Sequence, residues 1–126
     1  MRLRTPQTTY HRGLVAEAFC RFALRVKGYR ILASRYRSPR GEIDIIAIRG
    51  KMIAAIEVKA RASSREAILS ISPKQRQRVQ SAALDFLARN AALSQHSLRF
   101  DVMLVTPLRW PEHIADAWRP EARWFV

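Results

Sequence analysis

Two short apolar runs separated by a tight turn limit the fold of this chain more than any other feature. Residues 42–48 and 52–61 are rich in isoleucine, valine and alanine, and Arg49-Gly50-Lys51 lies between them. β-Branched residues favour strands, and a short glycine-containing segment between two strands is typical of a hairpin. The sequence therefore predicts two antiparallel neighbouring strands, Glu42–Ile48 and Met52–Arg61.

A helix and a strand are predicted before this hairpin. Thr9 can cap a helix from about Tyr10 to Lys27, and Gly28 supplies its stop. Apolar side chains recur in it at helical spacing, which predicts an amphipathic helix with this stripe toward the core: Val15, Ala18, Phe19, Phe22 and Val26. Residues 29–36 are predicted as a strand, and Ser38-Pro39-Arg40-Gly41 as a turn.

A second helix and a fourth strand follow the hairpin. Ser72-Pro73 is a good cap and first-turn pair for a long helix. Its predicted apolar face is Val79, Ala83, Phe86 and Leu87, and its polar face is Lys74, Arg76, Arg78 and Arg89. Phe100–Val105 is predicted as a strand, and the segment after Pro107 as a short strand or helix. The order α-β-β-β-α-β predicts an α/β fold with a mixed sheet flanked by helices.

Length and composition indicate one domain over residues 1–126, since no flexible linker or repeat divides the chain. Its longest apolar runs are far shorter than the roughly 20 residues needed to span a bilayer, so we expect no membrane association. The single cysteine, Cys20, cannot form an intrachain disulfide and is expected to be a small core residue. This cysteine usage favours a reducing cytoplasm.

The net charge of +13 favours a polyanionic partner. Arginine supplies most of the basic residues and recognises phosphate with two parallel hydrogen bonds. The excess is spread along the chain rather than confined to a tail. The sequence therefore predicts nucleic-acid binding; the alternative is an arginine-rich composition on an ordinary solvated surface.

Three acidic residues stand in apolar surroundings, where a carboxylate needs a cation or hydrogen bonds to compensate it. They are Asp44, Glu57 and Glu17. Alternation along a strand places Glu57, Lys59 and Arg61 on one face. An acid and bases are thus presented side by side.

A hairpin that turns about Gly50-Lys51 places Asp44 directly opposite Glu57. Two carboxylates at cross-strand spacing repel each other unless they share a cation such as Mg²⁺ or Mn²⁺. The alternative is a cross-strand salt bridge in which Lys59 or Arg61 neutralises both acids. A register slip of one residue would separate the acids.

Two motifs carry a family resemblance. Gly41-Glu42-Ile43-Asp44-Ile45-Ile46-Ala47, followed by Ile56-Glu57-Val58-Lys59-Ala60-Arg61, resembles the D…ExK core of the PD-(D/E)xK nuclease superfamily and, within it, the bacterial YraN family of small endonuclease-like proteins. Archaeal Holliday-junction resolvases are similar. The resemblance implies a restriction-endonuclease-like mixed sheet. The chain departs from the family pattern at Arg35, where asparagine is usual, and at residues 63–69, where the family has a glycine-containing loop.

The resemblance implies a role for each site residue. Asp44 and Glu57 would be ligands of Mg²⁺ or Mn²⁺, with Glu17 as an accessory ligand from the first helix. Lys59 would orient or activate the attacking water, or stabilise the charge that develops on the phosphate. Glu42 is a second candidate, because it faces away from the ligands only if its strand is regular.

Nucleic-acid contacts are expected where the second helix begins, since free backbone N–H groups favour a phosphate there. The resemblance supports this role for Lys74, whereas Gln75 also fits an ordinary first-turn polar residue. Further expected contacts are Arg61, Arg76 and Arg78. Asp101 is expected to pair with Arg99 or another base, the three tryptophans to lie in the core or an interface, and the three histidines to be surface or structural residues.

The predicted function is a metal-dependent nuclease acting on DNA, including branched or structured DNA. One alternative is a nucleic-acid-binding module that keeps a vestigial nuclease site, and another is an interaction factor in DNA processing. A homodimer is expected only by analogy with the resolvases.

Overall fold

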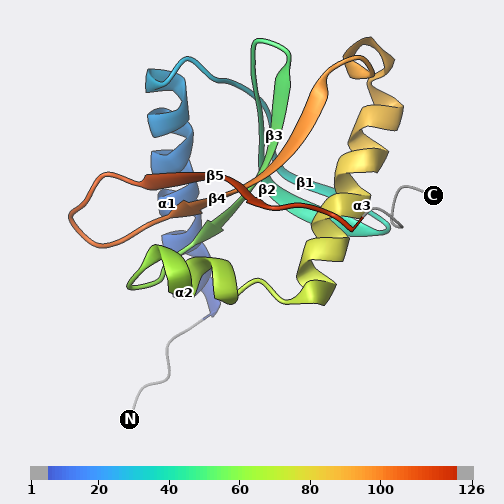
Figure 1. The fold of residues 1–126 in the computed structure, drawn as a ribbon. Helices are drawn as coiled ribbons and strands as arrows, with labels where there is room; N and C mark the ends of the chain where they lie inside the picture. Colours follow the sequence, from blue (N-terminus) through green and yellow to red (C-terminus); the bar gives the residue numbers. More distant parts are fainter. Residues whose placement is uncertain (1–5, 122–126) are drawn as a thin grey trace.

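The chain forms a five-stranded mixed sheet with helices on both sides (Figure 1). The computed structural model describes residues 6–121, with side chains from residue 13 onward. In chain order its elements are α1 (Pro6–Val26), β1 (Arg30–Ser38), β2 (Gly41–Arg49), β3 (Met52–Lys59), α2 (Ser64–Leu69), α3 (Pro73–Arg89), the short 3₁₀ helix η1 (Ala91–Leu93), β4 (Ser97–Leu104) and β5 (Glu112–Trp118). The predicted α/β class is therefore confirmed. The segment after Pro107 forms a strand, β5, which is one of its two predicted alternatives, and α2 and η1 are added to the predicted order.

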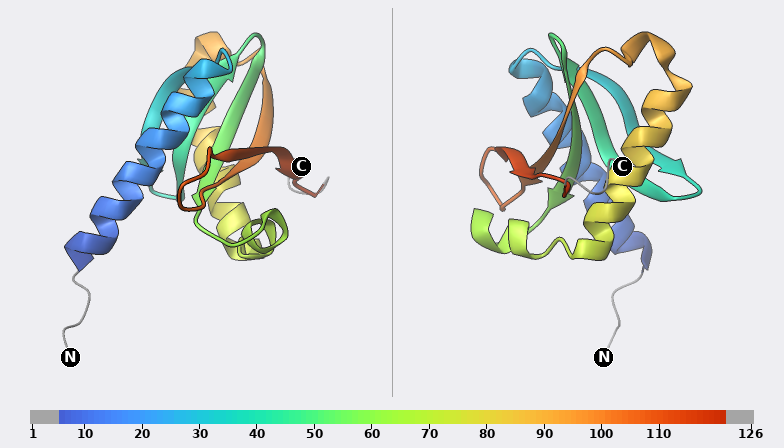
Figure 2. Two further views of the ribbon diagram at one scale, coloured as in Figure 1. Left: turned by 90° about the vertical axis from the view of Figure 1, so that its left-hand side faces the viewer. Right: turned by 45° about the vertical axis from the view of Figure 1, so that its right-hand side comes forward.

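The strands lie in the order β1-β2-β3-β4-β5, and only the β3–β4 pair is parallel. This parallel pair needs a crossover, which α2 and α3 supply. Helix α1 covers one face of the sheet and α3 the other (Figures 1 and 2). Each face has its own core: Cys20, Ala23 and Leu24 of α1 pack with Ile45 and Ile56, whereas Val79, Ala83 and Phe86 of α3 pack with Ile46 and Ile53.

The hairpin between β2 and β3 has the predicted register. Arg49 pairs with Met52 across the two-residue turn Gly50-Lys51, and the pairing continues to Ile45 with Ile56. Gly50 has a φ of 60°, a left-handed conformation that glycine adopts without steric conflict. The turn thus fixes which residues of β2 and β3 are neighbours.

Ser72 and Pro73 begin α3 as predicted. The Ser72 side chain accepts a hydrogen bond from the Gln75 backbone N–H, and Pro73 is the first helical residue. By contrast, α1 begins at Pro6, so Thr9 lies inside this helix and not at its N-cap. Proline suits the first helical position because its missing N–H would have no partner there.

The buried face of α1 is not the predicted one. The stripe expected to face the core is exposed in the structure: Val15, Ala18, Phe19, Phe22 and Val26. Cys20, Ala23 and Leu24 are buried instead. Helix α1 carries two apolar stripes, and the one with smaller side chains lies against the sheet. The prediction of Cys20 as a core residue is confirmed.

Among residues 6–121, no helix is both long and apolar enough to cross a membrane.

Candidate metal and phosphate site

A cavity of about 280 Å³ opens where α1, β2, β3 and α3 meet. Its lining is Glu17, Glu42, Asp44, Glu57, Val58, Lys59, Gln75, Arg78 and Val79. Four of these residues are acids, although the whole basic chain has only ten Asp and Glu residues. All four candidate catalytic residues, Glu17, Asp44, Glu57 and Lys59, therefore lie around one space.

Two of the four acids are matched by arginine. Glu17 pairs with Arg35 at 2.8 Å, and Glu42 pairs with Arg78 at 3.6 Å. Asp44 and Glu57 form no ion pair with any cation of the described residues within salt-bridge distance. The two carboxyl groups at the centre of the cavity thus have no ion-pair partner among the described residues, although Lys59 lines the same cavity.

The Asp44 carboxylate is held by the neighbouring strand. The backbone N–H of Val58 donates to its Oδ2 at 2.9 Å, just beyond the last residue pair of the β2–β3 ladder. Strand β2 is irregular here, because Ile43 packs on the α3 side while Ile45, two residues later, packs on the α1 side. In a regular strand both would point the same way. Glu42 also lines the cavity, where it pairs with Arg78 of α3, so its candidacy as a second acid keeps a geometric basis.

Glu57 is buried, and its surroundings disfavour the charged form of its carboxyl group. Burial, a hydrogen bond with Asp44 and the negative charge of that carboxyl together raise the pKa of Glu57 to about 10. Glu57 therefore holds a proton at neutral pH when no cation is present, and the two carboxyl groups share it.

Lys59 is oriented by α3 and not by the acids. Its Nζ donates to Oε1 of Gln75 at 3.3 Å, while its positive charge acts to lower the pKa of Glu57. Arg61 is exposed and donates to the carbonyl of Ala60. Within residues 6–121, neither base forms the cross-strand salt bridge that was the alternative to a metal site.

Glu17 comes from α1 and is held by an unusual residue. Arg35 Nε donates to its carboxylate at 2.8 Å, and Arg35 has a φ of 52°. This left-handed conformation is uncommon for residues other than glycine and asparagine. Asparagine, which the motif resemblance implies at this position, would adopt it more easily. Nothing in the sequence around Arg35 indicates its left-handed backbone conformation or its contact with Glu17.

Cys20 lies beneath this corner of the cavity. Burial and the negative charges of Glu17 and Asp44 raise the pKa of its thiol to about 12. The thiol therefore stays protonated and unreactive.

The five predicted nucleic-acid contacts are spread over three environments. Gln75 and Arg78 line the cavity. Arg61 and Lys74 are exposed outside its lining. Arg76 is half-buried, with its guanidinium 5.6 Å from the Trp118 ring centre and its Nε buried without a hydrogen-bond partner in the described part of the chain. The geometry favours Arg78 over Arg76 as a phosphate contact, because Arg76 packs on an aromatic ring.

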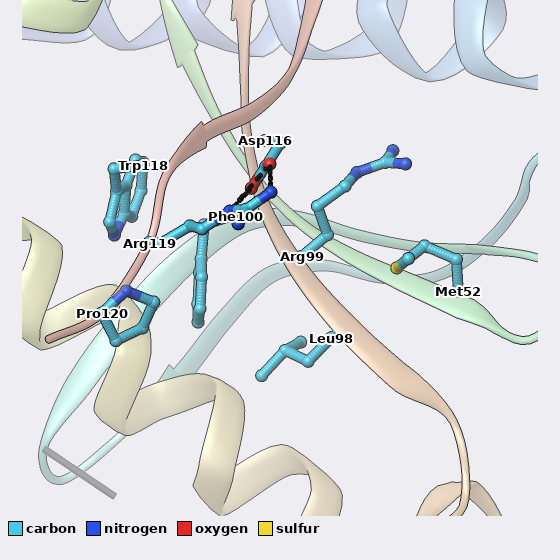
Figure 3. Close-up of a pocket in the computed structure, with 8 residues that line it drawn as sticks. All are labelled: Met52, Leu98, Arg99, Phe100, Asp116, Trp118, Arg119 and Pro120. Carbon is cyan, nitrogen blue, oxygen red and sulfur yellow. Dashed lines mark hydrogen bonds and ion pairs between the residues drawn. The ribbon is translucent and has the colours of Figure 1, made fainter. Parts of the chain in front are cut away.

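A larger cavity, of about 530 Å³, lies elsewhere, between β4, β5 and the segment after β5 (Figure 3). Phe100 and Trp118 stack on its wall, and its charged side chains already have partners: Arg119 binds Asp116, and Arg99 binds Asp101. It shares no residue with the carboxylate cavity. The larger cavity therefore does not coincide with the candidate site.

Asp101 has a structural role, as predicted. It is buried and accepts from Arg99, His113 and the backbone N–H of Asp116. The His113 side chain is buried in this network, and Trp118 lies in the core while Trp110 is exposed. Trp124 and the His11 side chain lie outside the residues that the structure describes.

The donor set fits a hard divalent cation with few protein ligands. Every candidate ligand atom is a carboxylate oxygen, which Mg²⁺ and Mn²⁺ prefer. Within the described residues, no three acidic, histidine or cysteine side chains are gathered closely enough to enclose a metal. Glu17 is turned to Arg35, which leaves Asp44 and Glu57 as the pair. Mg²⁺ commonly binds through one or two carboxylates and keeps several waters.

The Glu57 pKa predicts an unusual dependence of stability on pH. The pKa is raised on folding, so the stabilisation is complete below the ordinary glutamate range and is lost as pH rises toward 10. In chelator, the free energy of unfolding should fall by on the order of 1 kcal/mol per pH unit from about pH 5.5 to 8.5. Glu57→Gln should remove this fall, because the amide carries no titrating proton. Urea unfolding at several pH values measures it.

Mn²⁺ or Mg²⁺ should raise the wild-type melting temperature, and more so at higher pH, because the cation displaces the shared proton. Asp44→Asn and Glu57→Gln should each remove this shift. A wild-type melting curve that is the same in millimolar metal and in chelator would contradict metal binding.

Comparison with known proteins gives a consistent family match. The model described as "Uncharacterised protein family UPF0102" matches residues 16–105. A UPF0102 protein of Parvibaculum lavamentivorans is 45% identical over 116 residues, which cover 92% of this chain and 87% of that protein. UPF0102 protein amb4503 of Paramagnetospirillum magneticum is 48% identical over 120 residues, covering 92% and 93% of the two chains. The matched residues include the whole carboxylate cavity.

Proposed function

The chain belongs to the uncharacterised protein family UPF0102, and we propose that it is a metal-dependent nuclease whose reaction centre is the cavity around Asp44, Glu57 and Lys59. The observation that carries the proposal is the pair of hydrogen-bonded carboxyl groups, Asp44 and Glu57, with which no arginine or lysine of the described residues forms an ion pair. A chain of net charge +13 has many bases with which to neutralise a structural acid. Leaving this pair without one favours a cation from solution.

The resemblance of the two motifs to the PD-(D/E)xK superfamily supports the same assignment, as does the mixed sheet that carries them. A bound Mg²⁺ or Mn²⁺, held by Asp44 and Glu57, would supply Lewis-acid polarisation of the scissile phosphodiester. Fold and motif resemblance fix a site more securely than an activity, so the assignment depends on the geometry of this chain's own residues.

The protein side chains divide the remaining work. Val58 fixes the Asp44 carboxylate through its N–H, and Gln75 fixes Lys59 through its side-chain carbonyl. The Lys59 ammonium can then donate to a phosphate oxygen as negative charge develops there, or orient the attacking water. Arg78 stands at the same cavity, on the first turns of α3, where the helix dipole also favours an anion.

The substrate class is DNA, and its branched or structured forms are the first to test. Purified protein is incubated with linear, nicked, flap and four-way-junction DNA in Mg²⁺, in Mn²⁺ and in chelator. We expect metal-dependent strand cleavage of at least one form. Absence of cleavage in all four, with DNA binding intact, would contradict the nuclease assignment.

One observation favours a second candidate, a nucleic-acid-binding module with a vestigial site. Arg35 binds the Glu17 carboxylate, which withdraws an accessory acid from the metal pair. Arg35→Asn should release Glu17. If the wild type binds DNA without cutting it and Arg35→Asn restores metal-dependent cleavage, the vestigial-site candidate is correct for the natural chain.

DNA binding should weaken steeply as salt rises, because each phosphate contact releases a counterion. The log–log slope of affinity against salt changes by about 0.9 for each contact on duplex DNA. Arg78→Ala should therefore reduce the slope by about 0.9, whereas Arg89→Ala, at the far end of the same helix, should leave it unchanged. Fluorescence anisotropy between about 50 and 200 mM salt measures both. An unchanged slope in Arg78→Ala would exclude a phosphate contact at this residue.

A further inference from the structure

The largest departure from ordinary surface chemistry is on the outer face of α1. Four bulky apolar side chains lie there in one line, which we call the α1 seam: Val15, Phe19, Phe22 and Val26. Their exposed fractions are 58%, 37%, 55% and 64%. Scattered apolar residues are normal on a protein surface, but a continuous apolar line marks a contact surface.

The loop between β4 and β5 extends this surface. Trp110, which is 53% exposed, lies edge-on to Phe19 and Phe22, with ring centres 5.4 and 5.9 Å apart. The loop lies beside α1 in the ribbon views (Figures 1 and 2). Leu108 of the same loop is fully exposed and has a φ of 60°, a strained conformation for leucine. Trp110 thus forms one wall beside the α1 seam, and Leu108 adds apolar surface nearby in the loop.

The spacing of the seam selects a helix as its occupant. The intervals from Val15 to Phe19, Phe22 and Val26 are four, three and four residues. This is the alternation of the a and d positions of a heptad, which pack against a second helix as knobs into holes. Ala16 and Ala18 flank the seam with small side chains, which let two helix backbones come close.

The order of residues selects a second copy of the same chain. The seam has the same sequence in both directions, valine-phenylalanine-phenylalanine-valine, with the same intervals. Two antiparallel copies related by a two-fold axis between residues 20 and 21 therefore place valine against valine and phenylalanine against phenylalanine. A self-complementary patch of this kind is what an isologous dimer requires. Binding of an unrelated partner helix would not require the seam to have the same order of residues in both directions.

The size of the surface is adequate. The seam with Trp110 and Leu108 exposes on the order of 600 Å² of mostly apolar surface per copy, near the roughly 800 Å² per partner of a standard interface. Two copies of net charge +13 repel each other, and salt screens that repulsion. Association through the seam should therefore tighten as salt rises, opposite to DNA binding.

We propose that the α1 seam is the interface of an antiparallel homodimer, in which Val15 contacts Val26 of the partner subunit and Phe19 contacts Phe22 of the partner subunit. Glu17 lies on the other side of α1, in the carboxylate cavity, so the interface leaves the cavity open. The proposal stands independently of the nuclease assignment.

Sedimentation velocity of nucleic-acid-free protein tests the association. We expect a reversible dimer whose dissociation constant falls as salt is raised. Phe22→Asp should raise this constant at least tenfold, because it places two like charges at the centre of the interface. Leu69→Asp changes an apolar residue on α2 that is even more exposed, at 68%, and should not alter the dissociation constant. Circular dichroism checks that both variants fold.

Oxidative cross-linking tests the direction of the helices. The double variant Val15→Cys and Val26→Cys should form a disulfide-linked dimer, because the two positions face each other across the two-fold axis. Either single variant should not, because like positions are far apart in the antiparallel arrangement. Cross-linking by the single variants would exclude this register. A wild type that stays monomeric at all salt concentrations would overturn the proposal. Binding of that monomer to anionic lipid vesicles through the seam would assign the surface to a membrane instead.

Discussion

Replacing Lys59 by alanine should lower the rate of metal-dependent DNA cleavage by about 10²–10³-fold while leaving DNA affinity nearly unchanged. The ammonium group is held beside the carboxyl pair by Gln75 and is in position to meet charge that develops on the phosphate. Interactions that strengthen only in the transition state change the rate and not ground-state binding. Loss of one such donor commonly lowers the rate by about 10²–10³-fold. Single-turnover cleavage and anisotropy on the same DNA measure the two quantities separately.

Lys51→Ala is the matched control for Lys59→Ala. Lys51 is exposed in the β2–β3 turn, at the opposite end of the same strand, so its removal deletes an equal charge away from the cavity. We expect wild-type cleavage from this variant. Equal losses of cleavage in Lys51→Ala and Lys59→Ala would mean that overall charge, and not a positioned ammonium, supports the reaction.

Gln75→Ala should give an intermediate loss of cleavage, since it leaves the ammonium in place but removes its orienting acceptor. An effect as large as that of Lys59→Ala would assign Gln75 a direct role at the phosphate. Wild-type cleavage would mean that the contact between the two side chains does not matter.

The residue pairs between β2 and β3 could be predicted from the sequence because they depend on the turn that joins the two strands. A two-residue turn at Gly50-Lys51 sets the register, and alternation then carries it along both strands. Proximity of Asp44 and Glu57 followed from that register. Isoleucines lie on both buried faces of these strands, so the apolar pattern alone does not fix the register and the turn does.

The orientation of α1 could not be predicted, because periodicity does not say which of two apolar stripes is inside. Phe19 and Phe22 are more hydrophobic than Cys20 and Ala23, yet the smaller pair lies against the sheet. Close packing favours the face that lets the helix approach, and total hydrophobicity does not decide it. The exposed stripe then becomes available for a partner.

The side-chain contacts that shape the site also could not be predicted from the sequence. Arg35 reaches Glu17 from a left-handed backbone position, and Gln75 reaches Lys59 from another element. Such contacts depend on how helices are placed on the sheet. Helix α2 did have a local signal, since Ser63 caps it by accepting from the Glu66 N–H, a pairing typical of helix starts.

Replacing Gly41 by alanine should destabilise the protein more than any other single methyl addition at its described glycines. A Cβ at Gly41 would overlap the backbone carbonyl of Arg78, so α3 would have to move away from β2. Backbone cannot give way as a flexible side chain can, and overpacking commonly costs about 1–3 kcal/mol or more. We expect a loss of at least about 3 kcal/mol in the free energy of unfolding, measured by urea titration.

Gly50→Ala separates this steric effect from backbone strain. Gly50 has a positive φ but open space around its Cα, whereas Gly41 is confined by packing alone. The strain at Gly50 should cost about 1–2 kcal/mol and leave the cavity unchanged. Displacement of α3 in Gly41→Ala should also move Gln75 and Arg78 away from Lys59. The folded fraction of this variant should therefore cleave DNA more slowly than the wild type, in addition to being less stable. Equal stability of the two variants would mean that α3 does not approach β2 as closely as the structure places it, and the contact from Gln75 to Lys59 would lose its basis too.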